Sequence, residues 1–129
     1  MATIQFDLVS PERRLASIAA SEIHIPGSEG DFTAMAEHAS LLTTLRPGVI
    51  KVVAGSDVTE YVVTGGFVEV SGTAASVLAE HAVPKAEVTA DTVNTLIAEA
   101  EEAAKGTVGA EKDVAEKRVA DTKALLELI

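Results

Sequence analysis

The fold of this chain is decided by residues 25–48, IPGSEGDFTAMAEHASLLTTLRPG. Two glycine-bearing segments bound this stretch, residues 26–30 and residues 46–48. Glycine reaches positive φ without a Cβ clash and proline pre-sets the φ of a turn residue, so both segments predict sharp reversals. A short run containing Phe32 and a polar segment around His38 lie between them. The pattern predicts strands joined by tight turns, with an acidic turn and a histidine displayed on the surface.

Period-two alternation extends the same pattern on both sides of this stretch. Near the N-terminus, Ile4, Phe6 and Leu8 alternate with polar residues, which indicates a half-buried strand. Turn signals recur about every 8–12 residues, and no helical period appears before residue 84. We therefore expect an antiparallel β-sandwich or flattened barrel of about eight short strands as the first domain, residues 1–83.

Glycine also marks two places inside this β portion. Residues 55–57, Gly-Ser-Asp, lie between two β-branched runs and predict a hairpin turn. Gly65 and Gly66 fall inside a strand pattern. They are expected to interrupt that strand, either as a bulge or as a close approach between two backbones.

From residue 84 onward the pattern becomes helical. Apolar residues recur at spacings of three and four, first as Val93, Leu96, Ile97, Ala100 and Ala104, then as Ala115, Val119, Thr122, Leu126 and Ile129. Thr89 or Asp91 can cap the first helix, and residues 106–109 separate it from the second. The second domain, residues 84–129, is therefore predicted to be an α-helical hairpin. Because both stripes are narrow and rich in alanine, we expect the hairpin to be the mobile part.

Composition limits the kinds of partner and location. The 129 residues include 20 acidic and 10 basic residues, a net charge of −10, and the acidic excess is present in both domains. Such a surface is repelled by phosphate backbones and anionic lipid, so we expect no nucleic acid and no direct lipid insertion. The sequence has no cysteine, no long apolar run and no N-terminal pattern of a signal or transit peptide.

Candidate chemistry is sparse. His24, His38 and His81 lie on three separate predicted elements without the spacing of a metal site. A phosphate loop at residues 27–30 is disfavoured because Glu29 and Asp31 would face the anion. No serine lies in a nucleophile elbow, and no acid, base and oxyanion donor come together. We therefore predict a non-catalytic protein without metal or cofactor.

Five motifs carry a family resemblance, namely FDLVSPE, IPGSEGDF, EHASLLTTLRPG, YVVTGGFVEV and VLAEHA. Together they cover about residues 4–82, and in this order they resemble the epsilon chain of F-type ATP synthases, called delta in mitochondria. The resemblance implies a many-stranded β-domain followed by two helices. It also implies a part of the central stalk, or rotor, that couples the ring of c subunits to the gamma shaft during ATP synthesis. The place implied is the cytoplasmic face of the bacterial inner membrane, as a peripheral subunit.

The resemblance also implies partners and contact residues. The gamma and c subunits would bind the β-domain, and the helices would meet the alpha and beta subunits transiently. The contact with a basic loop of the c subunits would use Ser28, Glu29, Gly30, Asp31 and His38. Thr43, beside the His38 segment, is the candidate contact with gamma. The alternative for Glu29 and Asp31 is that they are ordinary solvated turn residues.

A nucleotide-responsive regulatory module, whose hairpin inhibits ATP hydrolysis, is the alternative function. Nucleotide-binding family members carry I/L-D-x-x-R-A at the first helix, whereas residues 88–96 read VTADTVNTL, without the arginine. Residues 107–129 also carry a net negative charge, which disfavours insertion against an acidic target. An isolated metal-dependent enzyme is a third and more distant hypothesis.

Overall fold

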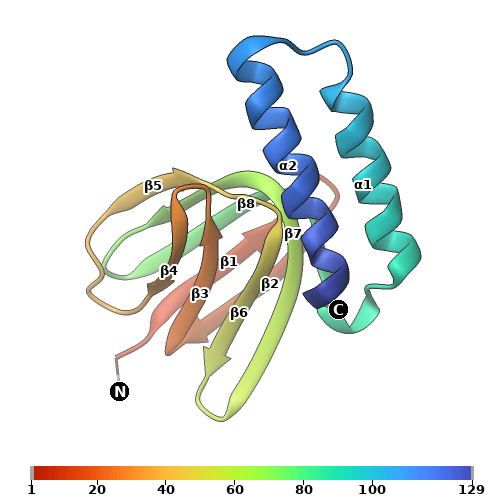
Figure 1. Cartoon of the computed structure of the whole chain (residues 1–129). Coiled ribbons are helices and arrows are strands. Elements are labelled where there is room, and N and C mark those ends of the chain that lie inside the picture. Colours follow the sequence, from red (N-terminus) through yellow and green to blue (C-terminus); the bar gives the residue numbers. More distant parts are fainter. Residues whose placement is uncertain (1, 129) are drawn as a thin grey trace.

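The computed structural model describes residues 2–128 and shows a β-domain followed by a pair of helices (Figure 1). The elements in chain order are β1 (Ile4–Val9), β2 (Arg14–Ala20), β3 (Glu22–Gly27), β4 (Gly30–Ala34), β5 (Leu41–Thr44), β6 (Gly48–Ala54), β7 (Asp57–Val70), β8 (Ala74–Pro84), a 3-10 turn η1 (Lys85–Glu87), α1 (Ala90–Ala104) and α2 (Gly109–Leu128). The helices described are not long and apolar enough to cross a membrane.

The strands form a sandwich because the long β7 takes part in both layers. The strand order is β2-β1-β8-β7-β6-β3-β4, and β5 also pairs with β7. Residues 57–63 of β7 pair with β6, whereas residues 67–70 pair with β5. Figure 1 shows β7 as a long curved strand that carries the sheet from one layer to the other. The predicted β-sandwich with a C-terminal helical hairpin is therefore confirmed.

One strand pair departs from the predicted antiparallel arrangement. β1 and β8 are parallel, with Gln5 opposite Ala74 and Val9 opposite Leu78. Parallel neighbours need a crossover, and here that connection consists of all the strands from β2 to β7. Alternation along a strand predicts which side chains face the core, but it contains no information about a partner so distant in the chain. The expectation of an entirely antiparallel sheet was wrong at this pair.

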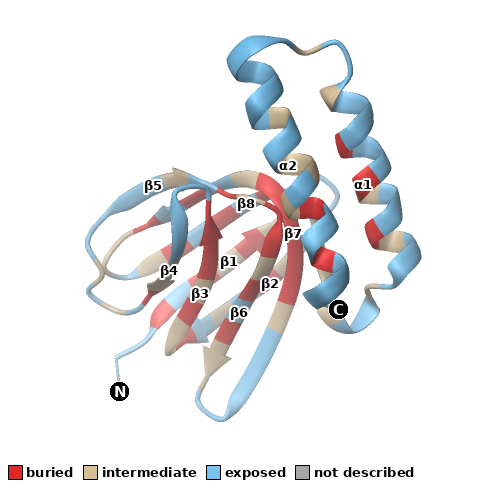
Figure 2. Ribbon diagram, in the orientation of Figure 1, coloured by how far each residue is buried: buried red, intermediate tan, exposed pale blue. Residues whose placement is uncertain are grey.

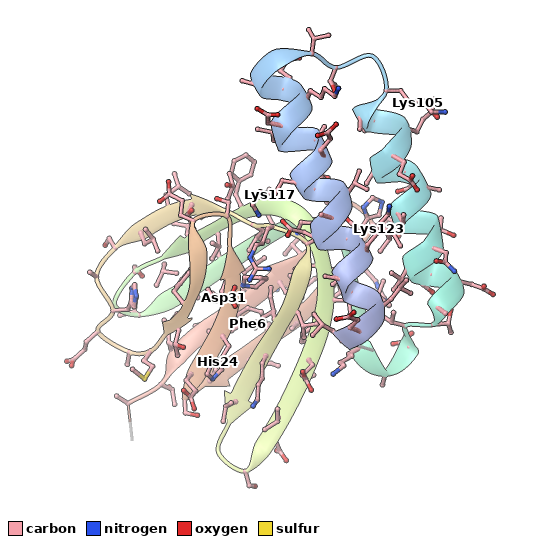
Figure 3. The ribbon with its side chains drawn as sticks, viewed as in Figure 1. Phe6, His24, Asp31, Lys105, Lys117 and Lys123 are labelled. Atoms are coloured by element: carbon pink, nitrogen blue, oxygen red, sulfur yellow. The ribbon has the colours of Figure 1, made fainter. Side chains whose placement is uncertain are left out.

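The sandwich core is largely aliphatic. Ile4, Phe6 and Leu8 of β1 are fully buried, and Phe6 lies inside the β-domain (Figure 3). Ile50 and Val52 belong to the same cluster of buried side chains. Buried and exposed residues alternate along several strands in Figure 2. Each fully buried aliphatic or phenylalanine side chain stabilises the folded state by about 1.5–3 kcal/mol, so this cluster provides most of the apolar stabilisation of the β-domain.

Gly65 and Gly66 do not break β7. Pairing with β8 keeps one register on both sides of them, since Thr64 lies opposite His81 and Gly66 opposite Ala79. Both glycines have positive φ, 54° and 121°. A Cβ on Gly66 would lie 2.1 Å from the carbonyl oxygen of Leu78. Of the two expected alternatives, the close approach between backbones is the one found, and no bulge is present at this point of β7.

The helical hairpin has its own small apolar cluster. Thr89 caps α1, and its side chain accepts a hydrogen bond from the backbone N–H of Thr92 in a capping box. The buried side chains that join the hairpin to β7 are Val62, Val93, Ile97 and Leu125. Figures 1 and 2 show the hairpin against β6 and β7, with its connecting turn projecting beyond the sandwich. That placement leaves the turn without support from the β-domain.

The predicted buried stripe of α2 was wrong at one position. Leu125 is fully buried, whereas Leu126 keeps 39% of its surface exposed. A helical period of 3.6 residues allows the next buried residue to lie either three or four positions after Thr122. The packing of α2 against α1 and β7 selects Leu125, three positions later. Ile129, the last member of the predicted stripe, lies outside the described residues.

Candidate partner-binding surfaces

The predicted acidic turn is a tight connection between β3 and β4. Ser28 and Glu29 form the turn itself, and Gly30 opens β4 with a φ of 137°. The backbone N–H of Ser28 donates to the carbonyl of Thr44 at 2.9 Å, and the two hydroxyl oxygens lie 2.6 Å apart. The turn is therefore fixed against the end of β5, while Glu29 is exposed to solvent.

Asp31 is less available than the sequence suggested. Its carboxylate forms an ion pair with the guanidinium of Arg46. The Asp31 side chain is exposed and that of Arg46 is half-buried, so the pair lies at the surface beside the turn. Glu29 takes part in none of the ion pairs found within residues 2–128. The uncompensated negative charge of this turn is therefore that of Glu29.

His38 lies in the loop between β4 and β5. The preceding Glu37 has a positive φ of 68°, and its backbone N–H donates to the carbonyl of Gly72 at 2.8 Å. The imidazole Nδ1 of His38 is 2.5 Å from the carbonyl oxygen of Ala39, and the ring centroid lies 6.2 Å from that of Phe32. Since β4 separates this loop from the acidic turn, the structure does not place His38 in contact with Glu29 (Figure 1).

Thr43 is less exposed than the other three residues of β5. It is half-buried and lies opposite Val68, whose side chain is in the core. The neighbouring Leu42 is 70% exposed. Side chains alternate across a strand, so Leu42 points to the solvent side of the sandwich and Thr43 does not.

Sequence reasoning missed an apolar surface on the outer side of β5, β7 and β8. Phe67 and Leu78 are directly opposite each other in the β7–β8 pairing, and each is 56% exposed. Leu42 lies on the adjacent strand β5, opposite Glu69. We call these three residues, Leu42, Phe67 and Leu78, the outer apolar patch. The alternation of side chains along β7 could have revealed this patch. Because Phe67 precedes the inward-facing Val68, its side chain had to point outward.

Among the described residues, the histidines lie apart from one another, on separate segments of the β-domain. His24 contacts Glu22 at 3.4 Å, and the Nδ1 of His81 lies 3.0 Å from the Thr64 hydroxyl. Within residues 2–128, no three histidine or carboxylate side chains gather as metal ligands would. Burial raises the pKa of the Tyr61 phenol above its ordinary value.

The fold and these surfaces define a class of protein: a β-sandwich bearing a C-terminal helical hairpin. The family described as ATP synthase, delta/epsilon chain, beta-sandwich domain matches residues 3–85. The ATP synthase epsilon chain of Fuscovulum blasticum is 54% identical over 124 residues, covering 96% of this chain and 94% of the relative. The one from Rhodobacter capsulatus is 52% identical over 123 residues, covering 95% and 93%. This chain belongs to the family of ATP synthase epsilon chains.

Solved structures show the same fold at lower identity. A chain of the Euglena gracilis mitochondrial ATP synthase, solved as OSCP/F1/c-ring, superposes with a TM-score of 0.74 at 23% identity, covering 99% of this chain and 82% of that chain. A chain of the Tetrahymena thermophila mitochondrial ATP synthase, solved as central stalk/c-ring, gives 0.69 at 20% identity, covering 97% and 95%. The whole architecture, including the hairpin, is therefore shared with these structures.

Proposed function

We propose that this chain is a non-catalytic subunit of the rotor of a proton-translocating ATP synthase, where it joins the gamma subunit to the ring of c subunits. The outer apolar patch is the observation that carries the proposal, because a displayed apolar surface on a rigid sandwich suits binding and needs no reacting group. The structural relatives come from an F1/c-ring complex and a central stalk/c-ring complex, which supports this assignment. The chain would act as a peripheral subunit at the cytoplasmic face of the membrane, without a cofactor.

The gamma subunit is the proposed partner of the outer apolar patch. Phe67 and Leu78 form a cross-strand pair on regular strands, so their positions are fixed before a partner arrives. The cores of stable interfaces are apolar and contain aromatic residues. Thr43 faces away from this surface, so the proposed gamma contact is moved from Thr43 to Leu42, Phe67 and Leu78.

The acidic turn is the proposed contact with the c subunits. Ser28, Glu29 and Gly30 are exposed, and their backbone is fixed by the hydrogen bonds of Ser28 to Thr44. A basic loop on the c subunits would pair with Glu29, which would set register and orientation. Asp31 contributes less because Arg46 already pairs with it, and His38 would contact the ring separately from the other end of β4.

Glu29→Lys should lower proton-driven ATP synthesis or weaken assembly with the c-ring while leaving the isolated fold unchanged. The substitution places a positive charge against a basic loop and breaks no ion pair described within the chain. We expect a several-fold loss of synthesis in membrane vesicles, together with an unchanged melting temperature. Asp57→Lys is the matched control, because it reverses an exposed acid at another turn, between β6 and β7. Equal rates of ATP synthesis in the two variants would show that Glu29 is an ordinary solvated turn residue.

The two domains are proposed to bind different subunits. The β-domain would hold gamma and the c-ring, and the hairpin would meet the alpha and beta subunits transiently. β8 continues to Pro84, which pairs with Tyr61, so a chain ending after Glu87 keeps every strand pair intact. Such a truncation removes the hairpin with little disturbance of the sandwich backbone.

Removal of residues 88–129 is expected to change ATP hydrolysis by the purified complex by less than about twofold, or about 0.4 kcal/mol on the activation scale. Two of the four basic side chains of α2 already have acidic neighbours within the helix. Lys117 contacts Asp121 at 2.9 Å, and Lys112 lies 3.9 Å from Glu116. Little net positive charge therefore remains for an acidic target in the catalytic head. Steady-state hydrolysis assays test this prediction, and several-fold activation would establish the hairpin as an inhibitor.

A further inference from the structure

The hairpin is joined to the sandwich by few contacts, and one of them is unusually specific. The guanidinium of Arg118 on α2 reaches across to the carboxylate of Glu80 on β8. Its Nη2 donates to Oε2 at 2.5 Å, and Nη1 lies 3.5 Å from Oε1. Two nitrogens thus face two oxygens, the paired geometry that arginine permits and lysine does not.

Gly65 of β7 lies directly beneath this guanidinium. A Cβ placed on Gly65 would lie 2.9 Å and 3.0 Å from the two terminal nitrogens of Arg118 and 3.0 Å from the Glu80 carboxyl carbon. Any other residue at position 65 would therefore displace the arginine or the carboxylate. Gly65 also has a φ of 54°, a conformation unfavourable for residues with a side chain.

We propose that Gly65 and Glu80 form a binding site for a guanidinium group, here called the arginine site, and that its occupation by Arg118 closes the hairpin onto the sandwich. Both residues of the arginine site lie in the β-domain. The guanidinium that occupies the site comes from the hairpin of the same chain. The proposal is independent of the function proposed above, because it concerns the isolated chain.

The small size of the shared apolar cluster makes this contact important. The hairpin and β7 share Val62, Val93, Ile97 and Leu125 as fully packed residues, whereas the sandwich core is a separate and much larger cluster. On the α1 side, His81 lies 3.7 Å from Glu99, with both side chains largely exposed. A unit with little burial can open without unfolding the rest of the protein.

Thiol labelling measures this opening directly, because the chain has no cysteine of its own. Val62 lies beneath the hairpin, and its neighbour Val63 points into the sandwich core. The thiol introduced by Val62→Cys becomes reactive when the hairpin opens, whereas the thiol introduced by Val63→Cys reports unfolding of the sandwich. The ratio of the two labelling rates separates hairpin opening from global unfolding.

Arg118→Met should raise labelling at position 62 about threefold to fivefold and leave labelling at position 63 unchanged, as expected for a partly exposed ion pair. Arg118→Lys should restore little of the closure, since the paired geometry is lost. Glu80→Gln should act like Arg118→Met, and the double variant should be no worse than either single one. Gly65→Ala should also raise labelling at position 62, because the new Cβ displaces Arg118 from the arginine site. Labelling at position 63 then shows whether the substitution destabilises the sandwich as well.

Lys117→Met is the matched control, because it removes the same charge from the adjacent residue, whose ion pair with Asp121 stays within α2. It should leave both labelling rates unchanged. The proposal is overturned if Lys117→Met opens the hairpin as much as Arg118→Met, or if Arg118→Lys closes it fully. It is equally overturned if labelling at positions 62 and 63 rises together in every variant, since hairpin and sandwich would then open as one unit.

Discussion

Gly66→Ala is expected to cost more than about 4 kcal/mol in the free energy of unfolding, which is a large part of the stability of a domain this size. The new Cβ would lie 2.1 Å from the carbonyl oxygen of Leu78 and 2.8 Å from the Cα of Ala79. Both are backbone atoms of β8, so no side-chain rotation relieves the contact. The β7–β8 pair would have to separate at the centre of the sheet. Urea denaturation, or the yield of soluble protein, measures the effect.

Gly55→Ala provides the control for backbone conformation without crowding. Gly55 also has a positive φ, 64°, but within residues 2–128 no heavy atom beyond its two chain neighbours lies within 4 Å of a Cβ placed there. The expected cost is therefore only about 1–2 kcal/mol, the penalty for a left-handed residue. If Gly66→Ala and Gly55→Ala unfold at the same urea concentration, the close approach between β7 and β8 does not determine stability.

The second large effect is expected in binding. Replacing Phe67 and Leu78 together by aspartate should weaken binding of purified gamma at least about 100-fold, or about 2.8 kcal/mol. Truncation of one central interface residue costs about 2 kcal/mol or more, and here two charges would also have to be desolvated. Two aspartates directly opposite each other in the β7–β8 pair repel, so the melting temperature of the isolated chain is expected to fall modestly, and binding is measured well below it. Calorimetric titration with gamma gives the dissociation constant.

Val58→Asp is the control for this variant. Val58 is 53% exposed, close to the value for Phe67, and it lies in the same strand β7 but at the opposite end, beside the β6–β7 turn. It should bind gamma with the affinity of the unaltered chain. Equal weakening by Val58→Asp would show that charge alone, and not the outer apolar patch, governs the association.

Local patterns in the sequence predicted the elements well, because each depends on residues close together in the chain. Alternation placed Ile4, Phe6 and Leu8 in the core, and Thr89 begins the first helix as its capping residue. The same patterns failed where distant segments meet. The parallel β1–β8 pair and the choice of Leu125 over Leu126 depend on packing between elements, which no single element determines.

The candidate site was predicted less completely than the fold, for a similar reason. The turn at Ser28 and Glu29 is exposed as expected, but the ion pair of Asp31 with Arg46 joins residues fifteen positions apart and reduces the free charge of the turn. The outer apolar patch requires three strands to lie side by side before it exists as a surface. The sequence did not predict the contact of Arg118 with Glu80, because Gly65 and Glu80 meet Arg118 only after the hairpin has packed onto β7.

The most direct test of the central claim is proton-driven ATP synthesis by inverted membrane vesicles from which the resident epsilon chain has been removed. Adding this chain should restore synthesis together with binding of the catalytic head to the c-ring. The variant with aspartate in place of both Phe67 and Leu78 should restore neither. Rebinding of the unaltered chain without any recovery of synthesis would contradict the proposal that it couples the c-ring to gamma.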